Sequence, residues 1–312
     1  MSQNDIFIIG HSGFIGKALY EKVNKKNKIY LISKKKIFNI KNEFCYDVFT
    51  DFRWFKLLKN NCTIFFLAFN NNLYELEKNK SYIKKIEKFS KNFNKYIEHK
   101  KIFVNFIFTS TVTIYGNTNR RKLVNEKLKD NPKSNYDRAK LALENIFFKY
   151  EKKNNLNFVS LRLSNIYGVN LFNSQVNRGF MNKLIINIYN KKKVIIFGKG
   201  SNLRNYLYID DLINALVLSK KKIKDISGKI LIVCNNKSIS FNNIIKIISK
   251  TLNTSTEIKK TPYPNNINQI EKRSFRGSNL LLKKYIGWKP KINMNSGIKK
   301  IIKAVKIYEH NN

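Results

Sequence analysis

The sequence predicts an α/β protein built on a Rossmann-like, doubly wound parallel sheet with a smaller C-terminal α/β substrate-binding lobe. Three observations lead to this fold class. Short apolar runs alternate with longer amphipathic stretches through the first half of the 312 residues, as in doubly wound sheets. These runs are nearly continuous, as expected for strands buried on both faces of a parallel sheet. A glycine-rich loop follows the first run, where such folds carry one.

The expected elements can be placed in chain order. Strands are expected at IFIIG (6–10), KIYLIS (28–33), CTIFFLAF (62–69), KIFVNFIFTS (101–110) and NFVSLRLS (157–164). Helices are expected between them at 14–24, 82–99 and 136–150. Further along, we expect a helix at 180–189, a strand at KVIIFG (193–198) and a helix opened by YLYIDDL (206–212). The chain is therefore expected to form a dinucleotide-binding domain at 1–166 and a substrate-binding lobe at 167–312, partly interleaved with the first.

Lysine dominates the charge of the chain. The formal net charge is +41, and of the 61 basic residues nine are arginine, which leaves 52 lysines spread along the whole sequence. Proteins that bind phosphates and bases favour arginine for its bidentate fork, and no cluster of arginine with aromatic residues accompanies the charge. We therefore attribute the charge to compositional bias and expect no nucleic-acid partner, although a lysine-rich surface helps to recruit anionic substrates.

No segment has the pattern of a membrane span, a secretion signal or a metal site. The longest apolar runs are strand-sized, and the polar start MSQND leads into the first expected strand without a basic leader. Cys45, Cys62 and Cys234 form no CxxC pair and have no histidine at ligand spacing. We expect a cytoplasmic protein with free, mostly buried thiols and no bound metal.

The loop GHSGFIG places Gly10, Gly13 and Gly16 three residues apart, between the first expected strand and the first expected helix. Glycines at these positions permit a tight turn and let a pyrophosphate approach backbone N–H groups at the positive end of the helix. In this context the loop predicts dinucleotide binding. His11 lies inside the loop, and we assign no chemistry to it.

Residues after the second strand, and Asp47 after a short expected strand that precedes it, bear on the choice of dinucleotide. An acid at the end of the second strand holds the ribose of NAD, whereas a base accommodates the 2′-phosphate of NADP. Here Ser33 stands at the acid's position and Lys34 follows it, which favours NADP over NAD. Asp47, with Val48 beside it, is a candidate for contact with the adenine; the alternative is an aspartate that caps a turn or a helix.

A tyrosine and a lysine lie four residues apart in SNYDRAKLALE, where Tyr136 and Lys140 share one face of the expected helix. A nearby ammonium lowers the pKa of a tyrosine, which suits acid/base catalysis. Ser110 and Thr111 end the run that continues as TVTIYG, and ligands of doubly wound sheets sit beyond the carboxyl ends of the strands. We therefore expect both hydroxyls near Tyr136. The alternatives are a chance pair on a surface helix and a threonine-rich strand end.

Seven blocks in order make the sequence resemble the extended short-chain dehydrogenase/reductases that act on nucleotide sugars, such as UDP-glucose 4-epimerase. They are GHSGFIG, FFLAF, FTSTVTIYG, YDRAK, LRLSNIYG, GKGSNLRNYLYIDDL and IGWKP, and together they cover nearly the whole chain. The resemblance implies that Tyr136 is the acid/base and that Lys140 lowers its pKa and binds the nicotinamide ribose. Thr111, with Ser110 beside it, would hold the sugar oxygen.

The resemblance also assigns the remaining contacts. The cofactor would be covered or flanked by Phe14, Ile15, Leu67 and Ala68. The phosphates of the nucleotide-sugar substrate would be contacted by Asn165, Arg204 and Arg276, with Arg273 as the rival of Arg276. A homodimer is implied, formed through the helices that follow Tyr82 and Tyr136.

The choice of reaction rests on the two residues after Thr111. Dehydratases that the sequence resembles carry an acidic pair there, whereas this chain has Val112 and Thr113, so dehydration is disfavoured. We expect a nucleotide-sugar epimerase acting at C4 through a transient 4-keto intermediate, with an NADP-dependent 4-ketoreductase as the alternative. A non-catalytic Rossmann module that senses a dinucleotide or binds nucleic acid is the alternative of another class, and the retention of Tyr136 and Lys140 argues against it.

Overall fold

The computed structural model describes residues 4–23, 28–69, 81–119, 121–152, 156–169, 179–263 and 273–310. The large sheet and the segments that cover it comprise β1 (Ile6–Ile9), α1 (Phe14–Val23), β2 (Ile29–Ser33), β3 (Glu43–Cys45), η1 (Arg53–Leu57), β4 (Cys62–Phe66), α3 (Tyr82–His99), β5 (Val104–Thr111), η2 (Val112–Tyr115), α4 (Asn135–Glu151), β6 (Leu156–Leu163), α6 (Ile209–Lys221), α7 (Ile223–Ile226), β11 (Lys229–Val233) and α10 (Leu280–Ile286). The expected Rossmann-like α/β fold is thereby confirmed.

The seven strands of this sheet run in the order β3-β2-β1-β4-β5-β6-β11, and each neighbouring pair is parallel. Strand order reverses between β1 and β4, because β2 and β3 lie on one side of β1 and the later strands lie on the other. Such a switch point opens a crevice at the carboxyl ends of the strands. The glycine loop lies there, directly after β1.

Alternate residues of each strand enter two separate cores. Ile6 and Ile8 of β1 pack in the core that contains residues of α1 and α6, whereas Phe7 and Ile9 pack in the core that contains residues of α3 and α4. All four residues are fully buried. Successive side chains of a strand point to opposite faces, so a sheet with helices on both faces requires the continuous apolar runs seen in the sequence.

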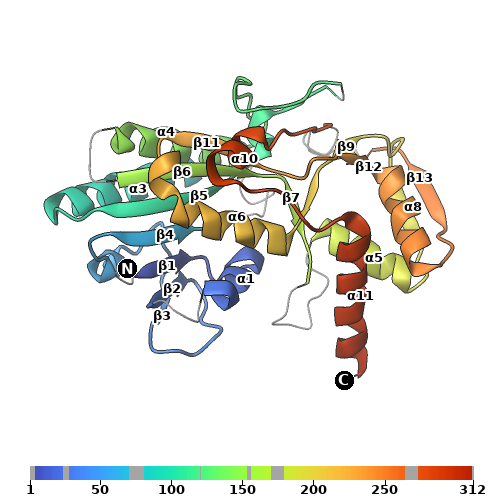
Figure 1. The fold of residues 1–312 in the computed structure, drawn as a ribbon, viewed down its shortest axis with the longest axis horizontal. Coiled ribbons are helices and arrows are strands. Elements are labelled where there is room, and N and C mark those ends of the chain that lie inside the picture. The colour runs from blue at the N-terminus through green and yellow to red at the C-terminus, as the bar shows by residue number, and fades with distance from the viewer. Residues whose placement is uncertain are drawn as a thin grey trace.

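The second lobe lies beside the carboxyl ends of the sheet, and its described residues form short two-stranded sheets and three helices (Figure 1). Its elements are β7 (Asn165–Tyr167), α5 (Phe180–Tyr189), β8 (Val194–Phe197), β9 (Leu203–Arg204), β10 (Tyr206–Tyr208), β12 (Ile239–Ser240), α8 (Phe241–Leu252), β13 (Ile258–Thr261) and α11 (Met294–His310). The strand pairs are β7 with β10, β8 with β13, and β9 with β12. Both the large sheet with its covering helices and this lobe therefore combine helices and strands.

The C-terminal segment is tied to the first turn of α6 through Asp211. The Asp211 carboxylate accepts hydrogen bonds from the backbone N–H groups of Lys291 and Ile292, both at 2.9 Å, and its carbonyl accepts one from Trp288 Nε1 at 3.0 Å. Trp288 is buried in the core that also contains α5, α6 and α8 residues. Asp211 therefore has a structural role at the start of α6, and Trp288 packs the C-terminal segment against the core.

One strand of the large sheet, β11, is absent from the sequence-based expectations, and β3 is expected there only as the short strand before Asp47. β3 has only three residues, and β11 comes from the second half of the chain, where it pairs with β6. α6 likewise packs on α1 although it lies beyond residue 166. The later part of the chain therefore contributes to the first sheet, and the domain boundary at 166/167 stays a prediction.

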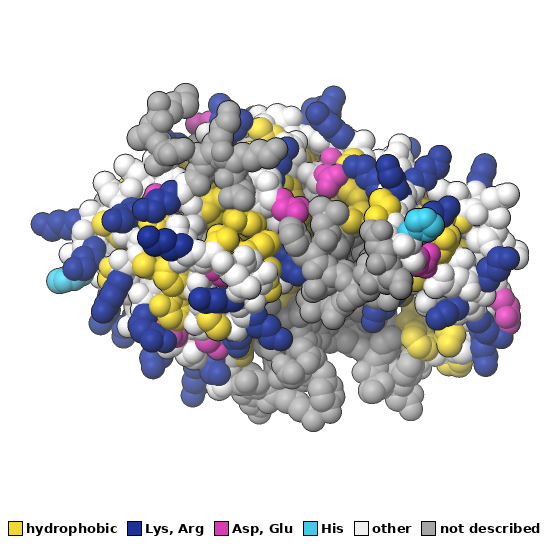
Figure 2. All heavy atoms as spheres, turned by 90° about the horizontal axis from the view of Figure 1, so that it is seen from below, with side chains coloured by type: hydrophobic (Ala, Val, Ile, Leu, Met, Phe, Trp, Pro, Cys, Tyr) yellow, Lys and Arg dark blue, Asp and Glu magenta, His cyan; other side chains and the backbone are white. Residues whose placement is uncertain are grey.

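Basic side chains are spread over the surface rather than gathered at one element, as Figure 2 shows for one face of the molecule. No helix within the described ranges combines the length and hydropathy that crossing a membrane requires. In the same part of the chain, no three His, Cys, Asp or Glu side chains gather closely enough to hold a metal ion. Cys62 and Cys234 are buried free thiols, whereas Cys45 is exposed.

Candidate active site

Two cavities meet at the glycine loop, along the carboxyl ends of the strands. The first has a volume of about 500 Å³ and extends toward β2 and β3, and the second has a volume of about 650 Å³ and extends toward β5, α4 and β6. Both are lined by Gly10, Gly13, Leu67 and Phe69. An elongated ligand with two ends therefore has a continuous path across the loop.

The three loop glycines are required for different reasons. Gly10 has φ of +91°, and a Cβ added to it would lie 2.7 Å from the Ala68 nitrogen. A Cβ on Gly16 would overlap the carbonyl oxygen of Gly10. The packing of the chain thus explains Gly10 and Gly16. Gly13 lines both cavities, and its added Cβ would come no nearer to the protein than 3.3 Å, so its missing side chain leaves room for a ligand instead. This cradle fits a dinucleotide pyrophosphate.

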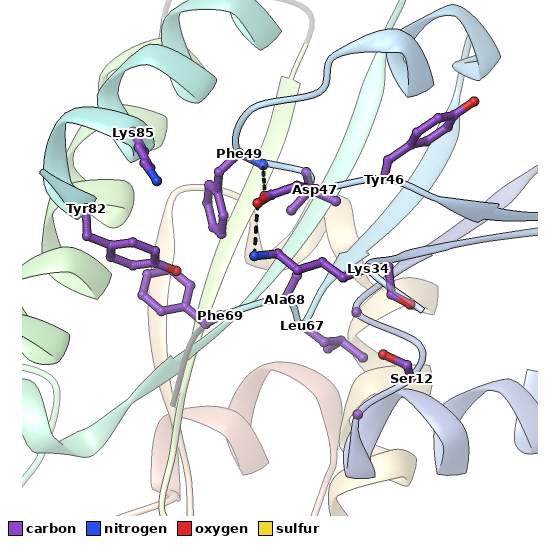
Figure 3. A pocket seen from close by; sticks show the side chains of 14 residues that line it. Ser12, Lys34, Tyr46, Asp47, Phe49, Leu67, Ala68, Phe69, Tyr82 and Lys85 are labelled. Atoms are coloured by element: carbon purple, nitrogen blue, oxygen red, sulfur yellow. Dashed lines mark hydrogen bonds and ion pairs between the residues drawn. The ribbon is translucent and has the colours of Figure 1, made fainter. Parts of the chain in front are cut away.

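The first cavity contains the residues expected at the adenosine end, namely Ser33, Lys34, Asp47, Val48 and Ala68. Figure 3 shows Lys34 and the backbone of Phe49 both directed at the Asp47 carboxylate. Lys34 Nζ lies 2.9 Å from Asp47 Oδ2, and Phe49 N donates to Asp47 Oδ1 at 3.1 Å. Asp47 therefore lines the cavity and also caps the turn that follows it.

Several residues of this cavity were not singled out individually by the sequence. They are Ser12, Tyr46, Phe49, Phe69, Tyr82 and Lys85. Tyr82 and Lys85 come from the first turn of α3, and their side chains approach Phe49 and Phe69 across the cavity (Figure 3). They reach the cavity because α3 packs beside β4 and β5, and no local sequence motif predicts that contact.

His11 joins the glycine loop to the loop between β2 and β3. It is fully buried, and its Nε2 lies 2.7 Å from Glu43 Oε1. The Glu43 carboxylate also accepts hydrogen bonds from the backbone N–H groups of Ile37, Phe38 and Asn39. Burial lowers the pKa of His11, and Glu43 opposes that effect. His11 thus holds the glycine loop and the segment from Ile37 to Glu43 together beside the first cavity.

The second cavity brings together the residues expected to carry the chemistry. Ser110 and Thr111 end β5, and Tyr136 and Lys140 occupy successive turns of α4. α4 begins at Ser134, which accepts a hydrogen bond from the Asp137 N–H while the Asp137 carboxylate accepts one from the Ser134 N–H. This capping box fixes the start of the helix and so fixes where Tyr136 points.

Thr109, Leu163, Ser164, Ile166 and Gly179 complete the second cavity together with Phe14, Ile15 and Gly16. Among these, the sequence singled out only Phe14, Ile15 and Gly16. Thr109, Leu163 and Ser164 lie at the carboxyl ends of β5 and β6, where strand periodicity alone does not distinguish them from core residues. Ile166 belongs to β7, and Gly179 directly precedes α5.

Lys140 is anchored by the backbone and by aromatic rings. Its Nζ donates to the Thr109 carbonyl at 2.6 Å and lies 4.0 Å from the ring centroid of Phe69. The distance from Nζ to the ring centroid of Tyr136 is 5.6 Å. Burial lowers the pKa of Lys140 to about 7, and Glu144 opposes that effect. The ammonium is therefore only weakly favoured in this enclosed position.

The pKa of Tyr136 is raised, which is opposite to the direction expected from its spacing to Lys140. Burial is the largest cause, and the charge of Asp137 adds to it. Spacing predicted that Lys140 would be close, but it did not predict that both groups would be buried or that the ammonium would bind Thr109. In the structure without ligand, Tyr136 is thus held as the neutral phenol.

A buried ion-pair network fastens α4 to β6 behind the site. Arg162 Nη2 donates to Glu144 Oε2 at 2.6 Å, and Arg162 Nη1 donates to Asp130 Oδ1 at 2.5 Å. Glu144 also accepts a hydrogen bond from Ser160 at 2.7 Å. The Arg162 guanidinium stacks over Tyr115 at 4.7 Å from its ring centroid. Sequence reasoning missed this network because its members are far apart in the chain.

The three residues expected at the substrate phosphates line neither cavity. Asn165 is exposed at the start of β7, and its Nδ2 donates to the Asn205 carbonyl at 3.1 Å. Arg204 donates to the Arg273 carbonyl, and Arg276 is exposed and donates to the Arg121 carbonyl at 3.4 Å. Their phosphate contacts, like the homodimer, stay predictions.

The chain matches one protein-family model and several curated proteins. A model of the NAD dependent epimerase/dehydratase family matches residues 6–234. A curated relative is dTDP-D-glucose 4,6-dehydratase of Dictyostelium discoideum, 34% identical over 133 residues, which are 39% of this chain and 30% of that protein. The chain spans less than two thirds of the length of the first curated relatives it matches.

Solved structures share the fold over almost the full length. UDP-glucose 4-epimerase from Thermotoga maritima, with UDP-glucose, has a TM-score of 0.84 at 20% identity and covers 98% of this chain and 99% of that one. RMD from Pseudomonas aeruginosa, complexed with NADPH, has a TM-score of 0.77 at 18% identity and covers 96% and 98%. At such identities the likeness concerns the fold alone.

Proposed function

The chain belongs to the NAD dependent epimerase/dehydratase family, and from this premise we propose that it is an NAD(P)-dependent nucleotide-sugar epimerase acting at C4 through a transient 4-keto intermediate. One observation supports the proposal above the others. Thr111, Tyr136 and Lys140 line one cavity that continues into the glycine loop, and no carboxyl side chain among the described residues lines that cavity. The arrangement supplies a proton carrier for a sugar hydroxyl without a separate acid to expel a leaving group.

Each residue of the set has a defined task in this reaction. Tyr136, as the phenolate, would take the proton of the C4 hydroxyl as C4 gives its hydride to the dinucleotide. Once the keto sugar has presented its other face, C4 would take the hydride back and Tyr136 would return the proton. Thr111 holds the sugar oxygen at the end of β5, and Lys140 orients the cofactor ribose. The bound dinucleotide supplies the hydride acceptor, and the positive charge of its oxidised ring opposes the raised pKa of Tyr136.

Dehydration is not supported at the positions where it needs acids. Val112 is buried in an apolar cluster with Tyr115, Val124 and Phe275, so it cannot take part in proton transfer. The Thr113 hydroxyl donates to Asp137, which is fully buried behind the cavity. We therefore do not assign this chain the reaction named for the Dictyostelium relative.

A 4-ketoreductase is the second candidate, and Lys34 favours it. This lysine lines the adenosine end of the first cavity, where a cation accommodates the 2′-phosphate of NADP. A reductase and an epimerase need the same Thr, Tyr and Lys set. A reductase takes the keto sugar from solution and consumes reduced cofactor. An epimerase forms the keto sugar in its own site and consumes no cofactor.

A turnover assay tests the proposed function directly. We expect the purified protein, supplied with a catalytic amount of dinucleotide, to convert UDP-glucose, UDP-N-acetylglucosamine or dTDP-glucose into a mixture with its C4 epimer, followed by proton NMR. Consumption of NADPH equal to the keto sugar reduced would establish the ketoreductase instead. Formation of a 4-keto-6-deoxy sugar would contradict both assignments.

For the cofactor, we expect tighter binding of NADP⁺ than of NAD⁺ in calorimetric titrations. Lys34→Ala should weaken NADP⁺ binding about tenfold, the worth of one hydrogen bond to a charged group, and leave NAD⁺ binding unchanged. Lys36→Ala is the matched control, because Lys36 is exposed and lies outside both cavities. Tighter binding of NAD⁺ by the unmodified protein would overturn the preference.

A further inference from the structure

A line of hydrogen bonds connects the second cavity to a fully buried carboxylate. Thr111 Oγ1 and Thr113 Oγ1 are 2.9 Å apart, and Thr113 Oγ1 donates to Asp137 Oδ1. The Thr113 N–H donates to Thr111 Oγ1 at 3.2 Å. Asp137 Oδ2 accepts from the Ser134 N–H at 3.2 Å. The line therefore begins at a residue of the cavity wall and ends inside the protein, at the start of α4.

The carboxylate dictates the direction of every hydrogen bond in this line. An ionised carboxylate only accepts, whereas a hydroxyl has one hydrogen to donate and two lone pairs. Thr113 donates its hydroxyl hydrogen to Asp137, so in the hydrogen bond between the two threonines Thr111 must be the donor. The N–H of Thr113 occupies one lone pair of Thr111. One lone pair of Thr111 is then left, and no hydrogen.

From this geometry we infer that Asp137, acting through Thr113, makes Thr111 a hydrogen-bond acceptor toward the substrate, so that Thr111 binds a sugar hydroxyl and does not donate to a keto oxygen. Asp137 and Thr113 are thus positioning residues. The inference rests on the proposed function, because it takes the ligand of the second cavity to be a sugar. It adds that the two hydroxyl groups of the site have different roles, Thr111 as acceptor and Tyr136 as donor.

Tyr136 is the complementary donor. Burial, together with the charge of the same Asp137, raises the pKa of Tyr136 and keeps it protonated. A keto oxygen offers only lone pairs, so of Thr111 and Tyr136 only Tyr136 can donate to it in the keto state. In the alcohol state, while Tyr136 is protonated, the sugar O–H is donated to Thr111, and it turns to Tyr136 when the phenolate takes its proton. The site therefore distinguishes the two oxidation states of the sugar by hydrogen-bond direction.

A neutron structure of the deuterated protein without ligand tests the direction itself. We expect the deuteron of Thr113 between its Oγ1 and Asp137, and the deuteron of Thr111 between the two threonines. A Thr111 deuteron directed into the cavity would overturn the inference. This measurement needs no substrate, so it is independent of whether the proposed function is correct.

Ligand titration tests the consequence for binding. With NADP⁺ bound, UDP-glucose should bind about tenfold more tightly than UDP-4-deoxy-4-fluoroglucose, because fluorine cannot donate to Thr111 and one buried hydrogen bond is lost. Thr113→Ser, which keeps the hydroxyl, should preserve this ratio. Thr113→Val frees the Thr111 hydroxyl to rotate, and the ratio should fall to less than about threefold.

The variants separate positioning from a merely structural role. A structural role would weaken the binding of both UDP ligands equally, so an unchanged ratio in Thr113→Val contradicts the inference. Asp137→Asn provides a second variant, since an amide can donate to Thr113 and reverse the line; its ratio should also fall. If UDP-glucose itself does not bind, the proposed substrate class is at fault, and the neutron structure still decides the direction.

Discussion

Arg162→Met is expected to lower the free energy of unfolding by about 3–5 kcal/mol, the cost of leaving a buried charge without its partner. The Arg162 and Glu144 side chains are each only 1% exposed. Their hydrogen bonds span β6, α4 and the segment that carries Asp130. Urea denaturation followed by tryptophan fluorescence measures the effect, because both midpoint and slope are obtained.

Two further variants show whether the loss comes from the uncompensated Glu144. Arg53→Met makes the same substitution at an exposed ion pair, where the Arg53 side chain is 72% exposed, and its effect should stay within about 1 kcal/mol. Combining Arg162→Met with Glu144→Gln removes the buried charge and should recover at least about half of the loss. If the double variant is less stable than Arg162→Met, the network does not act through Glu144.

The network also bears on the site, because it holds α4 against β6. Glu144 lies one turn beyond Lys140 on the same helix and raises the lysine pKa, against the effect of burial. Loss of the network should therefore weaken both the stability of the fold and the placement of Lys140. If Arg162→Met lowers turnover and the double variant recovers it, the network affects turnover through α4, which carries both Glu144 and Lys140.

Local patterns predicted the parts of the site that depend on local structure. Gly10 and Gly13 lie between β1 and α1, Gly16 lies in the first turn of α1, and Tyr136 and Lys140 lie on one helix. Spacing along a single element is enough to bring each set to one cavity. The strand ends at Ser110 and Thr111 follow from the rule that parallel strands gather their carboxyl ends.

Contacts between distant segments were not predictable in the same way. β11 reaches β6 from the second half of the chain, and Arg162 meets Glu144 and Asp130 across different elements. The direction of the Tyr136 pKa was missed for the same reason. It depends on burial by elements that sequence spacing does not describe. Arg204 shows a further limit, since its guanidinium donates to the Arg273 carbonyl and charge alone did not indicate that.

The catalytic pair gives the largest expected change in rate. Tyr136→Phe should lower kcat about 10² to 10⁴-fold, the usual worth of positioned acid/base catalysis, because it removes only the transferable proton. Fold and cofactor affinity should be retained, since the ring and its contact with Phe69 remain. Lys140→Met should lower both kcat and dinucleotide affinity. Steady-state kinetics and cofactor titration of each variant give these quantities.

Tyr115→Phe is the matched control for this experiment. Tyr115 is buried, stacks over Arg162 and lines neither cavity, so loss of its hydroxyl should leave turnover unchanged. A non-catalytic dinucleotide-binding module would show no turnover in any variant and the same cofactor affinity for Tyr136→Phe as for the unmodified protein. Measured turnover that survives Tyr136→Phe at full rate would instead mean that another group moves the proton. Because the described part of the second cavity offers no carboxyl side chain, that group would then have to be Lys140 or one of the serine and threonine hydroxyls that line the cavity.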